Sequence, residues 1–148
     1  MANLGFEIEL KWSGTGREGE GTASLSNHEV TYSAPYSMGG KGVGTSPEEF
    51  LLAAVCSCYS ATLFGVLRKE GLPADQVFIQ AEGTVTDYPV KSKFARIRVN
   101  PSIAGGVQEK LAEYREAAVT ARNKCFIGKT IMGNVEYEVG EVSIKQAE

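Results

Sequence analysis

The sequence has little of what metal sites and disulfide frameworks require. It contains one histidine, His28, and three cysteines, two of which, Cys56 and Cys58, are separated by a single residue. Common zinc sites need a longer spacer between cysteines or several imidazoles, so we expect no metal. Three thiols are also too few, and odd in number, for a disulfide framework. Any disulfide that they form in a reducing compartment is then transient and chemical.

Basic clusters and long apolar runs are also missing. The chain has 15 Lys+Arg against 18 Asp+Glu, a net charge of -3, and no run of more than two basic residues. Surfaces that bind nucleic acid or anionic membranes need clustered Lys and Arg, so we expect neither partner. No uninterrupted apolar stretch reaches the roughly 18–20 residues of a membrane span. No secretory leader is visible, and we expect a soluble cytoplasmic protein.

What is present suits one globular domain. The 148 residues are 43% hydrophobic, and a chain of this size can bury its own apolar core. We therefore expect a single domain over residues 1–148.

The N-terminal part is predicted to form three strands. Apolar and charged residues alternate from Phe6 to Trp12, which is typical of a half-buried strand. Two shorter segments, 23–25 and 30–32, indicate further strands around a turn at Asn27 and His28. Eight of the 17 glycines lie in the two loops that follow the first and third strands. Such loops can bring backbone close to a neighbour or a ligand.

A long apolar helix is predicted from Phe50 to about Arg68. Ser46 can cap it, Pro47 takes the first helical position, and Glu49 completes a capping box. The segment is apolar on every side and must therefore be buried on every side. We expect it to be wrapped by sheet, by a second helix or by a partner subunit.

The C-terminal half is predicted to contain two strands, 77–85 and 95–99, with Pro101 and Gly105-Gly106 stopping the second. A helix follows over 107–124, and a last strand region covers 135–144. The helix carries an apolar stripe spaced by three and four residues: Val107, Leu111, Tyr114, Ala118, Ala121 and Cys125. The order β-β-β-α-β-β-α-β, with strands in runs, predicts an α+β fold with a mainly antiparallel sheet and two helices.

Cys58 and Cys125 occupy matching places, each on the apolar side of one predicted helix. A buried free cysteine is most often only a small hydrophobic residue, so packing alone could explain both. If the two helices pack together, however, the sulfur atoms can come within bonding distance. Cys56 is about 200° around the helix from Cys58 and faces away, so we assign it a structural role.

Two charged residues are candidates on weaker grounds. Arg17 is a lone cation in a glycine-rich loop, where a solvated arginine is common. Glu48 lies in the first turn of the long helix, where the helix dipole favours a carboxylate. Neither residue alone indicates a function.

Together, three blocks of sequence resemble the OsmC/Ohr family, the osmotically inducible protein C-like and organic hydroperoxide resistance proteins. Residues 46–60 are similar to its helix motif, in which a cysteine beside an aromatic residue follows ten residues after a glutamate. The Arg17 loop resembles the family's Gly-Arg-Asp/Glu-Gly segment. Cys125, followed by Gly133-Asn134-Val135, resembles its second-cysteine motif. The blocks occur in the family's order.

The resemblance implies a thiol-dependent peroxidase, an antioxidant oxidoreductase that reduces organic hydroperoxides to alcohols without a bound cofactor. Cys58 would be the peroxidatic cysteine, Cys125 the resolving one, and Arg17 and Glu48 the activating pair. A thiolate attacks the peroxide and becomes a sulfenic acid, and the second thiol condenses with it to a disulfide. A dithiol reductant, in the family a dihydrolipoyl group, would reopen that disulfide. The family fold is an intertwined homodimer with long central helices and sites at the interface.

Helix geometry adds a condition to this assignment. Ten helical residues span about 15 Å, so Glu48 cannot reach Cys58 along its own helix. If both belong to one site, Glu48 comes from the other subunit. We therefore expect the two helices over 50–68 to pack antiparallel across a two-fold axis.

Three positions around Cys125 depart from the family pattern. Where many members have His, Pro and Ser, this sequence has Arg122, Phe126 and Gly128. These departures bear on the geometry and reactivity of Cys125, and a cation from Arg122 or Lys124 would favour its thiolate. Two alternatives stay open. One is a stress-response or small-ligand-binding protein of the same fold without peroxidase turnover, and the other is an interaction module with core cysteines.

Overall fold

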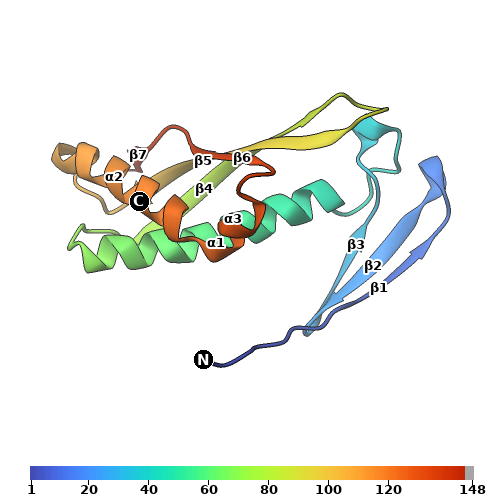
Figure 1. Cartoon of the computed structure of the whole chain (residues 1–148), viewed down its shortest axis with the longest axis horizontal. Coiled ribbons are helices and arrows are strands. Elements are labelled where there is room, and N and C mark those ends of the chain that lie inside the picture. The colour runs from blue at the N-terminus through green and yellow to red at the C-terminus, as the bar shows by residue number, and fades with distance from the viewer. Residues whose placement is uncertain (146–148) are drawn as a thin grey trace. The chain divides into compact units, whose positions relative to one another are not determined.

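The structure is a computed structural model that describes residues 1–145 (Figure 1). The chain divides into two units, Met1–Leu51 and Leu52–Glu148, with one sheet in each. The N-terminal elements are β1 (Glu9–Ser13), η1 (Gly16–Glu18), β2 (Glu20–Leu25), β3 (His28–Tyr32) and η2 (Tyr36–Met38). The later elements are α1 (Pro47–Lys69), β4 (Gln76–Thr86), β5 (Lys93–Ala104), η3 (Gln108–Lys110), α2 (Leu111–Lys124), α3 (Phe126–Ile131), β6 (Glu136–Val139) and β7 (Ser143–Lys145). The predicted α+β fold is confirmed.

The N-terminal unit contains an antiparallel meander in the order β1-β2-β3. The rings of Trp12 on β1 and Tyr32 on β3 lie 5.5 Å apart. Both residues are register partners of Gly21 on β2, which lies between them. A side chain at Gly21 would collide with the Tyr32 ring, so the glycine lets the two rings approach. The burial predicted for the first strand is wrong, because all of β1 is exposed in the chain. The turn lies at Ser26 and Asn27, and His28 begins β3.

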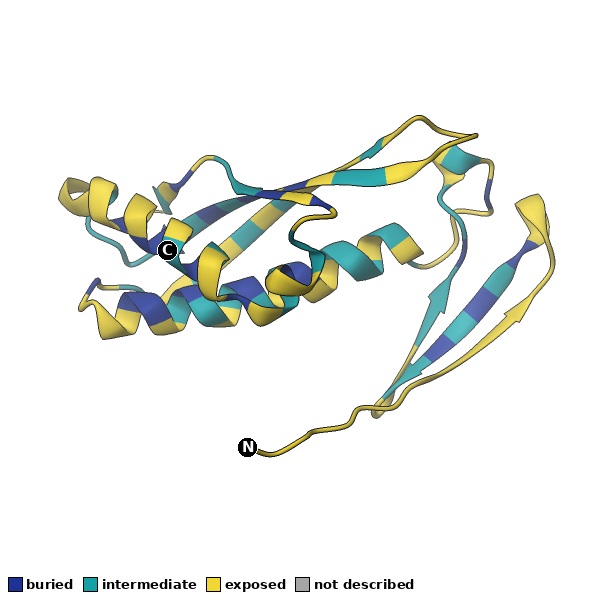
Figure 2. Cartoon of the chain, in the orientation of Figure 1, coloured by how far each residue is buried: buried dark blue, intermediate teal, exposed yellow. Residues whose placement is uncertain are grey.

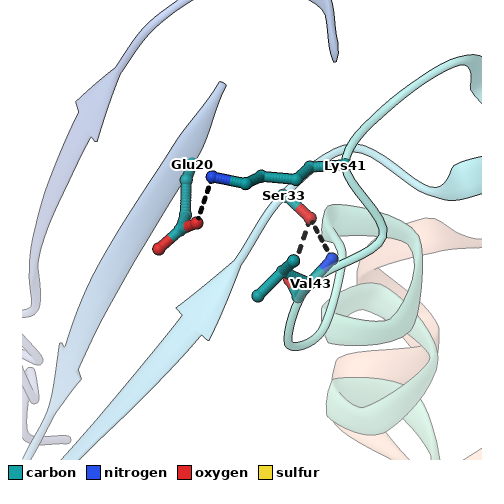
Figure 3. Close-up of polar contacts among 4 residues, drawn as sticks. All are labelled: Glu20, Ser33, Lys41 and Val43. Atoms are coloured by element: carbon teal, nitrogen blue, oxygen red, sulfur yellow. Dashed lines mark hydrogen bonds and ion pairs between the residues drawn. The ribbon is translucent and has the colours of Figure 1, made fainter. Parts of the chain in front are cut away.

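The second glycine-rich loop packs against its own unit. The buried Ser33 hydroxyl accepts a hydrogen bond from the Val43 N–H and donates one to the Val43 carbonyl, both at 2.8 Å (Figure 3). Lys41 forms an ion pair with Glu20 at 2.8 Å. Gly44 has φ +71°, and a Cβ there would lie 2.1 Å from a backbone oxygen of β3. The glycines of this loop therefore serve close packing against a neighbouring strand.

α1 begins as the sequence predicts. The Glu49 N–H donates to the Ser46 hydroxyl at 3.2 Å, and the Ser46 hydroxyl lies 3.5 Å from the Glu49 carboxylate, which forms a capping box. At the other end, Leu72 N–H donates to the Leu67 carbonyl and Gly71 N–H to the Arg68 carbonyl. This Schellman motif ends the helix at Lys69, four residues before Pro73.

Within the C-terminal unit, α1 is buried on only part of its surface, and its burial on every side stays a prediction. Its buried residues are Val55, Tyr59, Leu63, Val66 and Leu67, and Figure 2 shows buried and exposed positions alternating along the helix. Small residues lie exposed on another side: Ala54, Ser57, Ala61 and Gly65. Within the described chain, α1 is the one helix long and apolar enough to cross a membrane by length and composition, and 28% of that window is buried. Core helices pass the same test.

The second sheet is organised around β5. β4 pairs with it antiparallel, and β6 and β7 both pair with it in parallel, one after the other along its length. Of the two stop signals predicted for this strand, Pro101 is wrong, because β5 continues through it to Ala104. The strand ends at the second signal, Gly105, which has φ +78°. The final strand region divides into β6 and β7.

α2 presents the predicted stripe to the core, with Tyr114, Ala118, Ala121 and Cys125 all fully buried. The Tyr59 hydroxyl of α1 donates to the Ala118 carbonyl at 3.0 Å, so the two helices pack in direct contact. A short helix, α3, was not predicted. It begins directly after Cys125, and Cys125 is at once the last cap of α2 and the first cap of α3.

Candidate functional site

The packing of α1 against the α2–α3 junction brings two thiols together. Cys58 lies on α1 and is partly exposed, whereas Cys125 lies at the junction and is buried. The Cys125 thiol is a hydrogen-bond partner of the Cys58 sulfur, and it also lies 3.9 Å from the Val55 carbonyl oxygen. The one proton of Cys125 thus has two acceptors. The contact that the sequence left open, between sulfur atoms on the two helices, is present.

The surroundings of Cys58 favour its thiolate. Burial acts to raise the pKa of the Cys58 thiol, but hydrogen bonds from the Ile127 N–H, the Cys125 thiol, the Thr62 hydroxyl and the Phe126 N–H outweigh it. The pKa therefore lies below its ordinary value. The Thr62 hydroxyl is shared, because it also donates to the Cys58 carbonyl at 2.8 Å. A partly exposed thiol with a lowered pKa is the usual environment of a reactive cysteine.

Cys125 has the opposite character. Burial raises the pKa of its thiol, and although the Gly128 N–H acts to lower it, the hydrogen bond to Cys58 and the Cys58 charge raise it further. The two thiols are therefore unequal. The Cys58 thiol ionises more readily than an ordinary thiol, whereas the Cys125 thiol keeps its proton as long as Cys58 is a thiolate.

Cys56 fits its predicted structural role. Burial raises the pKa of its thiol, and the Cys125 charge adds to that shift. A protonated, half-buried thiol is a weak nucleophile.

Two buried tyrosines and an arginine complete the surroundings of Cys125. From the sequence, Tyr59 was included only as the aromatic residue beside Cys58, and Tyr137 was missed. The rings of Tyr59 and Tyr137 meet edge to face, with centroids 6.4 Å apart. Burial raises the pKa of both hydroxyls, and the Cys125 charge raises it further. Arg122 donates to the Tyr137 carbonyl at 2.8 Å and lies over the Tyr137 ring. The sequence signal nearest to Tyr137 is the Gly133-Asn134 pair of the second-cysteine motif, which ends three residues before it.

Arg17 and Glu48 do not form an ion pair in the structure. Arg17 is exposed on η1, and within the N-terminal unit its guanidinium has no carboxylate partner. Glu48 lies in the first turn of α1, and its Oε1 atom is buried without a hydrogen-bond partner among the described residues. Both groups are thus available for a partner.

The site carries thiol chemistry and no metal-binding set. Among residues 1–145, no group of three or more His, Cys, Asp or Glu side chains could hold a metal ion. What the site does hold is a reactive thiol, a second thiol in contact with it, and backbone N–H groups directed at the first. This arrangement suits a cycle between dithiol and disulfide.

The fold and the thiol pair together define a class: an α+β protein with two cysteines in contact between facing helices. The sequence model of the family described as OsmC-like protein matches residues 39–140. The chain therefore belongs to the OsmC-like protein family, as the three sequence blocks predicted.

The chain is also similar to individual proteins. The uncharacterised YmaD protein of Bacillus subtilis (strain 168) is 31% identical over 148 residues, which cover 98% of this chain and 97% of YmaD. A Legionella pneumophila structure described as an organic hydroperoxide resistance protein OsmC has a TM-score of 0.72 at 22% identity, covering 97% of this chain and 99% of that chain. A hypothetical protein from Aquifex aeolicus VF5 has a TM-score of 0.72 at 20% identity, covering 96% and 97%. The two structures share the fold.

Proposed function

We propose that this protein is a thiol-dependent peroxidase that reduces organic hydroperoxides to alcohols. The observation that carries the proposal is the contact between Cys58 and Cys125, in which the exposed thiol has a lowered pKa and the buried thiol a raised one. A peroxidatic cysteine must be ionised and accessible, and a resolving cysteine must wait beside it. The pair meets both requirements.

The chemical cycle has three balanced steps. The Cys58 thiolate attacks one peroxide oxygen, the O–O bond breaks, and the alkoxide takes a proton to leave as an alcohol. Cys58 is now a sulfenic acid, and the Cys125 sulfur attacks it, forming the S–S bond and releasing water. A dithiol, proposed to be a dihydrolipoyl protein, then reduces the disulfide by thiol–disulfide exchange and is itself oxidised.

Arg17 and Glu48 are proposed as the activating pair. The buried, unpartnered Glu48 Oε1 atom needs a donor, because a buried polar atom without a partner is unfavourable. A guanidinium can satisfy a carboxylate through two parallel hydrogen bonds. Arg17 oriented in this way would add a positive charge that favours a thiolate and holds a peroxide.

A homodimer is proposed for the active assembly. Glu48 and Cys58 are ten residues apart on α1, a distance of about 15 Å, so Glu48 would serve the Cys58 of the other subunit. The exposed small residues of α1, from Ala54 to Gly65, would allow two such helices to approach closely. This packing would also cover apolar surface that one chain leaves in water.

The substrate preference is proposed from the surroundings of Cys58. The N–H of Phe126 faces the Cys58 sulfur, and the Phe126 side chain is 70% exposed. An exposed aromatic side chain beside the reactive thiol favours a peroxide with an alkyl or aryl group over hydrogen peroxide.

The test is mass spectrometry of the reduced protein after one equivalent of cumene hydroperoxide, with hydrogen peroxide in parallel. We expect rapid loss of two hydrogens, mapped to a Cys58–Cys125 disulfide, and a faster reaction with the organic peroxide. Cys58→Ser should abolish peroxide consumption, whereas Cys56→Ser should leave it unchanged. An unreactive Cys58 would overturn the proposal and favour a ligand-binding or stress-response protein without turnover.

A further inference from the structure

Tyr137 carries a buried hydroxyl that forms no regular hydrogen bond among the described residues. The residue is 2% exposed, and its oxygen is buried with no formed hydrogen bond among the described residues. The group with which this hydroxyl interacts is the Cys125 thiol. Buried hydroxyls almost always find a partner, and one that does not calls for an explanation.

Three neighbours hold the Tyr137 ring in place. Gly128 leaves room for it, since a Cβ at that position would lie 2.3 Å from the ring atom Cε2. Tyr59 meets its edge, and Arg122 covers its face at 5.4 Å while bonding its carbonyl oxygen. Arg122 and Gly128 are two of the three positions at which the sequence departs from the family pattern. In the structure, both departures serve the same ring.

We propose that the Tyr137 hydroxyl is a positioning residue for Cys125, donating a hydrogen bond to its thiolate when that sulfur attacks oxidised Cys58. The inference rests on the proposed function, because it assigns a role within the resolving step. Gly128 and Arg122 hold the ring in place, which would keep its hydroxyl beside the Cys125 sulfur.

The resolving step explains when this hydrogen bond matters. In the reduced protein, Cys125 keeps its proton and shares it with Cys58. After Cys58 becomes a sulfenic acid, the negative charge on Cys58 is gone, and Cys125 must lose its proton to attack. The Cys125 sulfur forms the S–S bond, the S–O bond of Cys58 breaks, and the leaving hydroxide takes up a proton to become water. Tyr137 donates a hydrogen bond and is not consumed.

The effect of Tyr137 on the Cys125 pKa has the sign that this role requires, because a hydroxyl that donates to a thiolate lowers the pKa of the thiol. Burial is the main cause of the raised Cys125 pKa. The Gly128 N–H acts most strongly to lower that pKa, and the Tyr137 hydroxyl also lowers it, as the smallest of the causes. The titratable groups facing Cys125 are Cys56, Cys58 and Tyr59 on α1 and Tyr137 on β6. Of the two tyrosines, Tyr59 already donates its hydroxyl hydrogen bond to the Ala118 carbonyl. Tyr137 is therefore the tyrosine with a proton free for the thiolate.

The test isolates the attack by Cys125 without any peroxide. In a Cys56→Ser background, dithiobis(nitrobenzoate) first reacts with Cys58 and releases one thionitrobenzoate. Cys125 then attacks the mixed disulfide at the Cys58 sulfur and releases a second, so stopped-flow absorbance shows two phases. Cys125→Ser should abolish the second phase and identify it.

For Tyr137→Phe we expect an unchanged first phase and a second phase slowed about tenfold or more at neutral pH, the usual effect of one hydrogen bond to a charged group. The pH midpoint of the second phase should move upward, and the rates should converge at high pH. Tyr114→Phe is the matched control, since it removes another buried hydroxyl, bonded to Pro73 and Val107, and should leave the second phase unchanged. A second phase in Tyr137→Phe with the wild-type rate and midpoint would overturn the inference, as would equal slowing at all pH values.

A second variant guards against misfolding of the first. Gly128→Ala retains the hydroxyl but displaces the ring, and we expect the same slowing and the same upward shift of the midpoint. The two proposals fail differently. Wild-type protein with a normal second phase that consumes no cumene hydroperoxide would overturn the proposed function, whereas an unaffected second phase in both variants would overturn the role of Tyr137.

Discussion

At the scale of single residues, the site depends on an asymmetry between two chemically identical side chains. Cys58 is partly exposed and receives hydrogen bonds from two backbone N–H groups, whereas Cys125 is buried and lies beside the Cys58 charge. Sequence spacing could place both thiols on facing helices. It could not assign their different ionisation, because this depends on N–H groups of α3, a helix that no sequence pattern predicted.

The first prediction concerns the pH dependence of Cys58. Its lowered pKa means that, in a Cys56→Ser background, alkylation should reach half its maximal rate at a pH below that of an ordinary thiol. Cys125→Ala removes one of the donors that lower this pKa. The midpoint should therefore rise, and the rate at neutral pH should fall about threefold to tenfold. Iodoacetamide labelling across a pH series measures both.

Cys125→Ser is the matched control for that experiment, since a serine hydroxyl can still donate to the Cys58 thiolate. Its midpoint should stay close to that of the Cys56→Ser parent. An alanine variant that labels like the parent would show that the thiol contact does not influence the ionisation of Cys58.

At the scale of elements, the sequence predicted helices and strands best where residue type and spacing within the segment are enough to specify the structure. The capping box at Ser46, the apolar stripe of α2 and the three N-terminal strands all follow from spacing and residue type. β5 is different: Pro101 lacks an N–H and indicates a strand end, yet the strand continues through it. Its partner across the β4 ladder is Ile79, so long-range pairing overrides the local signal.

The second prediction concerns the start of α1. Ser46 is 5% exposed, and its hydroxyl accepts the Glu49 N–H. Ser46→Ala should leave that donor without its cap and lower the free energy of unfolding by about 1 kcal/mol. Urea denaturation at a fixed protein concentration measures the loss.

Ser60→Ala is the control within the same helix. Its hydroxyl donates to a backbone carbonyl one turn earlier, an interaction that helix interiors do not need. We expect a change within about 0.5 kcal/mol. Equal losses for the two variants would show that the cap contributes nothing specific.

At the scale of the whole molecule, the sequence and the structure agree on the fold class and the family, while the single-domain arrangement, the cytoplasmic location and the homodimer stay predictions. The amino-acid pattern predicts that α1 is covered on all sides, and the C-terminal unit covers only some of them. We expect a second subunit to cover the rest, which the periodicity of a single sequence cannot specify.

The third prediction tests that assembly. We expect a dimer by sedimentation velocity at low micromolar concentration. Ala61→Glu places a charge on the exposed small side of α1 and should weaken the dimer at least about tenfold, because a buried unpaired charge is strongly unfavourable. Peroxidase activity should fall with it, since the proposed site needs Glu48 from the other subunit.

Val119→Glu is the comparison variant, because Val119 is 49% exposed on α2 and lies outside the proposed interface. It should sediment like the parent. A wild-type chain that sediments as a monomer would remove the basis for sharing Glu48 between subunits.

The parallel pairing of β6 with β5 also has a consequence for biosynthesis. Parallel neighbours need a long crossover, here the segment holding α2 and α3, so β6 can join the sheet only after that segment has been made. The α3 amides and Tyr137 therefore reach the cysteines last. On a ribosome, α1 would emerge with a Cys58 thiol of ordinary acidity, and the reactivity of Cys58 would develop only as the finished chain closes around it.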